Sequence, residues 1–204
     1  MIITEINQQK KKGRYNLYID GSFYGGVDAE TIVKNGIKVG MEIDQVFLEN
    51  VIIESETRLA FEKLLNLISR QMYSKKDLEL KLFNKGFSKI VVDRAVAKAE
   101  EYGYIDDQLY AKLLVESKPL KSKREIKNAL FLKGLSSNII EDKICKIDEE
   151  EETSRAKVIS EKYIKNKEIN EKTMSGLYAY LARRGFNSGS ISKVLRMYKY
   201  EVEE

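Results

Sequence analysis

Basic side chains at repeated spacing are the main candidates for chemistry in this sequence. Gly86, Gly134 and Gly185 lie 48 and 51 residues apart, and each directly follows a lysine or an arginine. Cations of this kind pair with phosphates or with acidic protein surfaces, although a solvated helix face is the alternative interpretation of each one. The candidate partner-binding residues are Arg70, Lys75, Lys76, Lys85, Lys121, Lys123, Arg124, Lys133, Arg183 and Arg184.

Catalytic chemistry has little support in the sequence. The chain contains no histidine, which removes the commonest general base and a common zinc ligand. Cys145 is the only cysteine, so it has no internal disulfide partner, and Gly25-Gly26 is not followed by the Gly-Lys-Ser/Thr signature of a phosphate-binding loop. The acidic run 149–152 is expected at a helix start, where the helix dipole favours negative charge, rather than at a metal site. We therefore expect a protein that is not an enzyme, with no catalytic residue, cofactor or metal.

Charge and hydropathy indicate the environment and the kind of partner. No stretch approaches 18 uncharged apolar residues, and the N-terminus lacks the apolar segment of a signal peptide, so we expect a cytoplasmic protein without a membrane span. The net charge is +4, but residues 58–135 carry 17 basic and 10 acidic side chains, a local net charge of +7. This distribution favours a polyanionic partner for the middle third of the chain.

The repeated glycines belong to a longer pattern. Apolar residues stand eight and four positions before each glycine, one helical turn apart, and another apolar residue follows it directly. A period near 50 with these matches indicates internal duplication. Each glycine suits a left-handed helix C-cap, and Ser74, Ser122 and Thr173, twelve positions earlier, are the predicted N-caps of the same helices. Apolar periodicity before and after this helix predicts three helices in each repeat.

The first part of the chain follows a different pattern. Residues 2–27 alternate as strands do, and Asp20-Gly21 predicts a type I′ hairpin turn. Asp28 is expected to cap a short helix, and a long helix should begin near Asp44. The predicted fold is mainly α, with three tandem three-helix repeats in an elongated array and a small N-terminal β-hairpin and helix module. The expected boundaries are 1–57 for this module and its linker helix, then 58–105, 106–148 and 149–204 for the repeats.

Three stretches carry a resemblance to a known family. SRQMYSKKDLELKLFNKGF (69–87), GYIDDQLYA (103–111) and LARRGF (181–186) resemble the RecX family of recombinase regulators, and the resemblance covers about residues 58–198. It implies a regulatory protein of DNA repair, recombination and the SOS response, with the filament of the RecA recombinase as its partner. Lodged in the helical groove of that filament, it would modulate, and in the expected case inhibit, ATP hydrolysis, strand exchange and co-protease activity.

Other interpretations of the sequence stay open. A general nucleic-acid-binding helical repeat protein, with no dedicated protein partner, is the alternative to a filament regulator. Contact with single- or double-stranded DNA would run through phosphates, because the predicted third helices are not strongly basic. Among the 12 tyrosines, Tyr73, Tyr102, Tyr104 and Tyr110 are either interface anchors or packed side chains. A monomer is the expected state.

Overall fold

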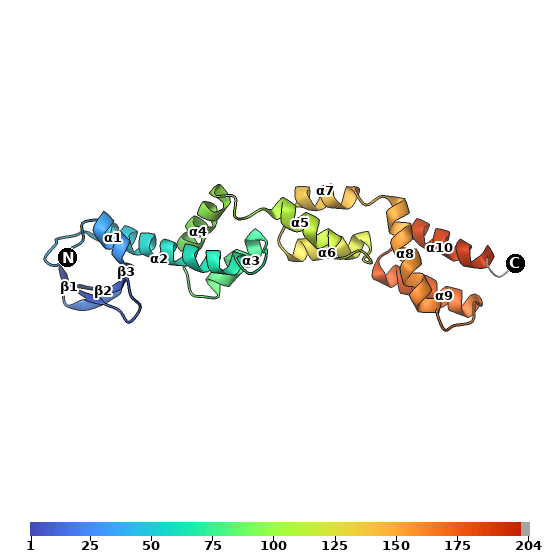
Figure 1. Cartoon of the computed structure of the whole chain (residues 1–204), viewed down its shortest axis with the longest axis horizontal. Helices are drawn as coiled ribbons and strands as arrows, with labels where there is room; N and C mark the ends of the chain where they lie inside the picture. The colour runs from blue at the N-terminus through green and yellow to red at the C-terminus, as the bar shows by residue number, and fades with distance from the viewer. Residues whose placement is uncertain (201–204) are drawn as a thin grey trace. The chain divides into compact units, whose positions relative to one another are not determined.

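This computed structural model describes residues 1–200 of the chain and is mainly helical, with a small N-terminal β-sheet (Figure 1). The predicted fold class is therefore confirmed. The chain divides into two compact units. The first contains Met1–Tyr73 and Asp77–Ile105, and the second contains Ser74–Lys76 and the residues from Asp106 onward. Within the described residues, no helix combines the length and the apolar character needed to cross a membrane.

The N-terminal sheet is antiparallel and has the strand order β1 (Ile3–Gln8), β2 (Arg14–Ile19), β3 (Ser22–Asp28). Asp20 and Gly21 connect β2 to β3 with φ angles of 48° and 82°. Positive φ at both central residues is what a type I′ turn requires, so the predicted hairpin is confirmed. Strand β1 adds a third strand beside β2.

Two helices follow the sheet. Helix α1 (Ala29–Lys34) is capped by the Asp28 carboxylate, as predicted, and α2 (Gln45–Ile68) begins next to Asp44, whose carboxylate is its N-cap. The first half of α2 packs on the sheet and the second half on α4, so the expected boundary after residue 57 falls inside one continuous helix. The core of the N-terminal module consists of Ile3, Leu17, Ile19, Val27, Ile37, Ile43, Leu48 and Val51.

The first repeat contains α2, α3 (Lys75–Phe83) and α4 (Lys89–Glu101). Helices α2 and α4 lie side by side (Figure 1). Apolar residues at the predicted one-turn spacing form its core, which consists of Ala60, Leu64, Leu78, Leu82, Val91, Val92, Ala95, Val96 and Ala99.

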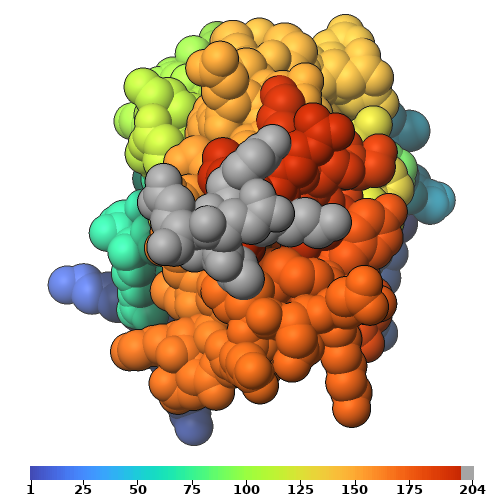
Figure 2. All heavy atoms as spheres, turned by 90° about the vertical axis from the view of Figure 1, so that its right-hand side faces the viewer, coloured from blue at the N-terminus to red at the C-terminus, as the bar shows by residue number. Residues whose placement is uncertain are grey.

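The second unit holds the other two repeats. The second repeat contains α5 (Asp107–Glu116), α6 (Lys123–Leu132) and α7 (Ser137–Cys145) around a core that includes Ile126 and Leu130. The third contains α8 (Glu149–Ile164), α9 (Glu171–Arg184) and α10 (Ser188–Tyr200), with Leu177 and Leu181 buried in its core. In Figure 2, α9 in orange and α10 in red lie against each other.

The repeat glycines and Ser122 follow the predicted pattern of helix ends, whereas Thr173 does not. Gly86, Gly134 and Gly185 have φ angles of 87°, 73° and 89°, as the predicted left-handed C-caps require. The prediction that Thr173 caps the third repeat's second helix is wrong. Helix α9 begins one turn earlier, and the Asn170 side chain accepts a hydrogen bond from the Thr173 backbone N–H. Asn is as good an N-cap as Ser or Thr, and Glu171 and Lys172 extend the helix readily.

Candidate functional site

The start of α6 is joined to the end of α9 by a buried serine. Ser122 is fully buried, and its hydroxyl donates a hydrogen bond of 2.7 Å to the carbonyl oxygen of Arg184. The same hydroxyl oxygen accepts from the Glu125 backbone N–H at 3.1 Å and completes a capping box. One side chain thus caps its own helix and satisfies a carbonyl that the end of another helix leaves open.

An arginine in the first turn of α6 covers the glycine of the next repeat. The Arg124 guanidinium donates to the carbonyl oxygens of Arg183 at 2.9 Å and Ala182 at 3.3 Å. Its charge lies where the carbonyls at the end of α9 are negative. A Cβ atom on Gly185 would stand only 2.9 Å from Arg124 Cβ, so an alanine there would have to displace Arg124.

A buried carboxylate completes this set of contacts. Glu152 is 2% exposed, and its carboxylate accepts from Asn187 Nδ2 at 2.6 Å and from the Lys123 backbone N–H at 3.4 Å. Nearby, Arg155 Nη1 donates to the Lys121 carbonyl oxygen at 3.0 Å. We call Ser122, Arg124, Glu152, Gly185 and the Arg184 carbonyl the inter-repeat joint.

The acidic run 149–152 serves the helix start and the packing of α8. Asp148 is the N-cap of α8, Glu149 forms an ion pair of 2.8 Å with Lys193, and Glu151 forms one of 2.5 Å with Arg155. No group of Asp, Glu or Cys side chains suited to a metal ion is found in residues 1–200.

Equivalent contacts recur around the segment Ser74–Lys76, which belongs to the second unit. The Ser74 hydroxyl donates to the Lys133 carbonyl oxygen at 2.7 Å, and the Lys75 backbone N–H donates to Asp107 Oδ1 at 2.9 Å. A Cβ atom on Gly134 would stand 2.6 Å from Lys76 Cβ. The arrangement of serine, cation, carboxylate and glycine is therefore a property of the repeat.

Several of the sequence-predicted cations act inside this arrangement. The side chains of Lys76 and Arg124 cover glycines, while Lys121 and Arg184 form ion pairs with Glu125 at 2.8 and 3.6 Å. Lys75 and Lys123 contribute backbone N–H groups and Lys133 a carbonyl. Sequence reasoning missed the joint, although Ser-x-Lys/Arg at 74–76 and 122–124 occurs at one fixed distance from Gly86 and Gly134.

Glu125 lies beside the joint, where Lys121 and Arg184 form ion pairs with it. Its burial raises the pKa of the carboxyl, but hydrogen bonds from Lys121 and from the Ser122 backbone, together with the charge of Arg184, outweigh that effect. The pKa of Glu125 therefore lies below its ordinary value of 4.5.

Three of the predicted cations have exposed side chains that neither cover a glycine nor take part in the joint. Arg70, Lys85 and Arg183 are exposed, and within residues 1–200 their side chains make no hydrogen bond or ion pair. Arg70 follows α2, Lys85 follows α3, and Arg183 lies in the last turn of α9. The structure thus separates the recurring cations into a group engaged by the fold and a smaller group open to phosphate or carboxylate.

An apolar surface on α6 was not predicted. Phe131 is 70% exposed and Leu132 77%, and Phe131 borders a cavity of about 250 Å³ that Lys127, Ile140 and Glu141 also line. Exposed large apolar side chains beside a hollow are typical of protein-interaction surfaces. The repeat alignment did not single out this surface, because the first repeat also has a phenylalanine, Phe83, at the position of Phe131.

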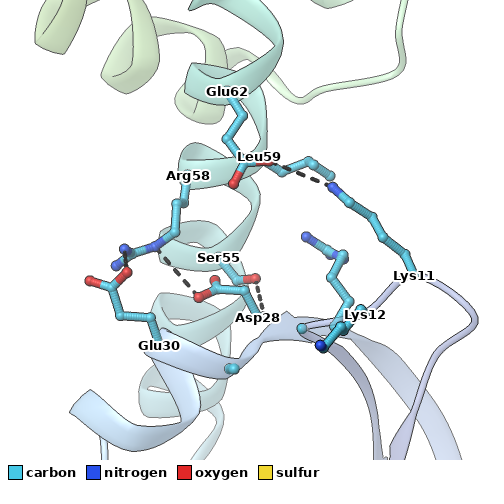
Figure 3. A pocket seen from close by; sticks show the side chains of 11 residues that line it. Lys11, Lys12, Asp28, Glu30, Ser55, Arg58, Leu59 and Glu62 are labelled. Atoms are coloured by element: carbon cyan, nitrogen blue, oxygen red, sulfur yellow. Dashed lines mark hydrogen bonds and ion pairs between the residues drawn. The ribbon is translucent and has the colours of Figure 1, made fainter.

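The N-terminal module contains a polar cavity of about 300 Å³ between the sheet and α2 (Figure 3). Arg58 contacts Glu30 and lies 3.5 Å from Asp28, and Lys11 lies 3.6 Å from Glu62. Burial raises the pKa of Asp28, but the hydrogen bonds from Thr31 lower it by more. The pKa of Asp28 therefore lies below its ordinary value of 3.8. Most of its acidic and basic groups pair with one another, and Lys12 is a lining cation that makes no hydrogen bond or ion pair within residues 1–200.

The fold and these surfaces define a class: a tandem three-helix repeat protein with an N-terminal sheet module, exposed cations and an exposed apolar patch. Residues 1–44 match the family described as "Regulatory protein RecX N-terminal domain". Residues 60–98 match the family described as "RecX, first three-helix domain". Regulatory protein RecX of Clostridium beijerinckii is 31% identical over 200 residues, covering 95% of this chain and 94% of that protein. The chain belongs to the RecX family of regulatory proteins.

Other relatives match over a shorter segment. Regulatory protein RecX of Caldanaerobacter subterraneus subsp. tengcongensis is 39% identical over 118 residues, which cover 58% of this chain and 60% of that protein. The match to the protein of the same name from Clostridium acetobutylicum is 31% identical and spans 55% of that relative's length.

Solved structures agree on the fold. A crystal structure of regulatory protein RecX superposes with a TM-score of 0.72 at 24% identity, covering 95% of this chain and 98% of the other. RecX from Lactobacillus salivarius gives a TM-score of 0.64 at 20% identity, covering 70% of this chain and 96% of the other.

Proposed function

We propose that this chain binds the filament that a RecA recombinase forms on DNA, and that it inhibits the ATPase, strand-exchange and co-protease activities of that filament. The observation that carries the proposal is the match over 200 residues to a relative named Regulatory protein RecX. The protein acts by binding, and its effect on the recombinase comes from restraining rearrangement of neighbouring protomers.

The exposed side chains support contact at several points. Arg70, Lys85 and Arg183 offer charge to acidic groups or phosphates, and Phe131 with Leu132 offers an apolar anchor. These groups are distributed over all three repeats. A filament presents the same protomer surface many times, so several modest contacts made together would give strong binding.

The proposal is tested by titrating the full chain into RecA ATPase assays on single-stranded DNA. We expect ATP hydrolysis to fall to a plateau as the chain saturates the filament. Two variants probe the surface, namely the triple variant Arg70→Glu, Lys85→Glu, Arg183→Glu and the double variant Phe131→Ala, Leu132→Ala. Each should need about tenfold more protein for half-inhibition, in keeping with the loss of one or two interface anchors.

Lys157→Glu is the matched control, because Lys157 is an exposed cation on α8 outside the proposed surface. It should inhibit like the wild-type chain. Unchanged ATP hydrolysis at saturating wild-type protein would refute the proposal, and full potency of both surface variants would refute the assigned contacts. Tight binding to naked DNA that recombinase does not improve would favour the general nucleic-acid-binding alternative. About six phosphate contacts would then weaken binding roughly a thousandfold between 50 and 200 mM salt.

A further inference from the structure

Three aromatic rings cluster on the surface of the first unit. The Tyr102 and Tyr104 ring centroids lie 5.7 Å apart, and those of Phe61 and Tyr102 6.0 Å apart, in edge-to-face geometry. Phe61 packs against the core of the first repeat, whereas Tyr102 is 54% exposed and Tyr104 51% exposed. The cluster is thus packed against the core through Phe61 and exposed to solvent through Tyr102 and Tyr104.

Helix termination does not require these tyrosines. Gly103 ends α4 with a φ angle of 69°, and the Tyr104 backbone N–H donates to the Ala99 carbonyl oxygen at 2.8 Å. An apolar residue at this position normally folds back on the helix, but Tyr104 leaves half of its surface in water. Tyr102 is the C-cap residue of α4, and the third helix of the second repeat, α7, has Lys146 at its C-cap. The repeat fold therefore does not explain why both residues are aromatic.

A basic cavity adjoins the aromatic cluster. About 230 Å³ in volume, it is lined by Phe61 and by the side chains of α1, α2 and α4; the cations among them are Lys34, Arg58, Arg94 and Lys98. Glu54 is the one carboxylate among its lining residues, and it already accepts hydrogen bonds from Lys34 at 2.5 Å and Asn35 at 3.3 Å.

Two groups in this cavity have no partner among the described residues. Arg94 is exposed and makes no hydrogen bond or ion pair within residues 1–200, and the buried Thr57 hydroxyl has no hydrogen-bond partner there. The cavity lining carries four cations and one carboxylate, so it suits an incoming group with several acceptor oxygens. Lys98 links the two features, because its Nζ lies 4.8 Å from the Phe61 ring centroid and 5.7 Å from that of Tyr102.

We propose that Tyr102, Tyr104, Arg94 and Lys98 form a binding site for single-stranded nucleic acid on the first unit. An unpaired base stacks on the tyrosine rings, and the adjoining phosphate lies over the cavity between Arg94 and Lys98. Exposed aromatic rings beside unpaired cations are the features with which proteins hold single strands without sequence preference. A duplex keeps its bases stacked on one another, so it offers no base to these rings.

The test is fluorescence anisotropy of a fluorescein-labelled 15-mer of thymidine with the full chain and no recombinase. It is therefore independent of the proposed inhibition. We expect Tyr102→Leu with Tyr104→Leu to weaken binding about tenfold, whereas Tyr102→Phe with Tyr104→Phe retains the wild-type affinity because the rings remain. Arg94→Glu should weaken binding about fivefold and reduce the slope of log K against log salt by about 0.7, the value for one single-strand phosphate contact.

The controls use side chains of the same kind elsewhere. Tyr178→Leu and Arg196→Glu replace an exposed tyrosine and an exposed arginine of the second unit and should leave the affinity unchanged. A duplex of equal length should bind at least fivefold more weakly, and the free nucleotide far more weakly than the oligonucleotide. Equal binding by the Leu and Phe variants would overturn the proposal, as would duplex binding that depends equally on the tyrosines. Circular dichroism checks that each variant is folded.

The chain has no tryptophan, so tyrosine emission gives a second readout. Stacking of a base on Tyr102 and Tyr104 should quench part of this emission when unlabelled oligonucleotide is added, and the quenching should disappear in the Leu variant. Quenching that persists in that variant would contradict the assignment.

Discussion

Gly86 and Gly185 have nearly the same backbone conformation but different surroundings. Their φ angles are 87° and 89°, and each ends the second helix of a repeat. An added Cβ atom would meet nothing within 4 Å at Gly86, whereas at Gly185 it would collide with the Arg124 side chain. Glycine is therefore required at position 86 for its backbone conformation alone, whereas at position 185 it is required both for that conformation and for the space that Arg124 occupies.

This difference explains the recurrence of basic residues beside the second helices. Arg124 lies over Gly185 and donates hydrogen bonds to the last carbonyls of α9, and Lys76 lies over Gly134. Serine, cation and glycine recur together because they join elements of the fold. Recurrence alone therefore does not identify a partner-binding residue, and exposure with no partner inside the protein is the better criterion.

The largest expected effect is a difference in stability between alanine substitutions at the two glycines. Gly86→Ala should destabilise the protein by about 1–2 kcal/mol, the cost of a side chain in the left-handed region. Gly185→Ala should cost about 3 kcal/mol, because Arg124 must also move and its hydrogen bonds weaken. Urea unfolding followed by circular dichroism measures both. Equal losses at the two positions would mean that the space above Gly185 has no energetic role.

A smaller effect is expected for the buried serine of the joint. Ser122→Ala removes an N-cap and leaves the Arg184 carbonyl without its donor, so we expect a loss of about 2 kcal/mol in the free energy of unfolding. Ser136→Ala is the matched control, since Ser136 occupies the N-cap position of α7 without a side-chain capping hydrogen bond. It should change stability by less than about 0.5 kcal/mol. Similar losses for both serines would contradict the assigned contact.

The smallest expected effect is a pH dependence at the joint. The folded-state pKa of Glu125 is lowered, so its ionised form stabilises the fold above pH 4.5, and this contribution is lost as the pH falls through the folded pKa. Glu125→Gln should reduce stability by about 0.5 kcal/mol at pH 7, because solvent screens these partly exposed ion pairs. Urea titrations from pH 3 to 7 should show the two proteins converging at the acid end. A constant gap across that range would exclude the ionised carboxylate as the cause.

Much of the fold could be predicted from the sequence because the deciding interactions are local. The type I′ turn at Asp20-Gly21, the caps at Asp28 and Ser122, and the left-handed glycines depend on residues close together in the chain. The N-cap of α9 could not be fixed in this way. Asn170 and Thr173 are both competent caps, and the choice depended on whether residues 171–173 extended the helix.

The candidate surfaces were harder to predict because they depend on distant contacts. Arg124 and Arg183 look alike in the sequence, but Arg124 donates to carbonyls 58 and 59 residues away while the Arg183 side chain is exposed. Likewise, the exposure of Phe131 follows from which face of α6 the core takes, and the repeat alignment gave it no prominence.

The most direct test of the joint is a double-mutant cycle between Arg124→Ala and Gly185→Ala, measured by urea unfolding. If Arg124 occupies the space above Gly185, its removal should lower the cost of Gly185→Ala to that of Gly86→Ala, a coupling of about 1–2 kcal/mol. If Gly185→Ala costs the same with and without Arg124, the two residues do not meet as described, and the joint must be held by other contacts.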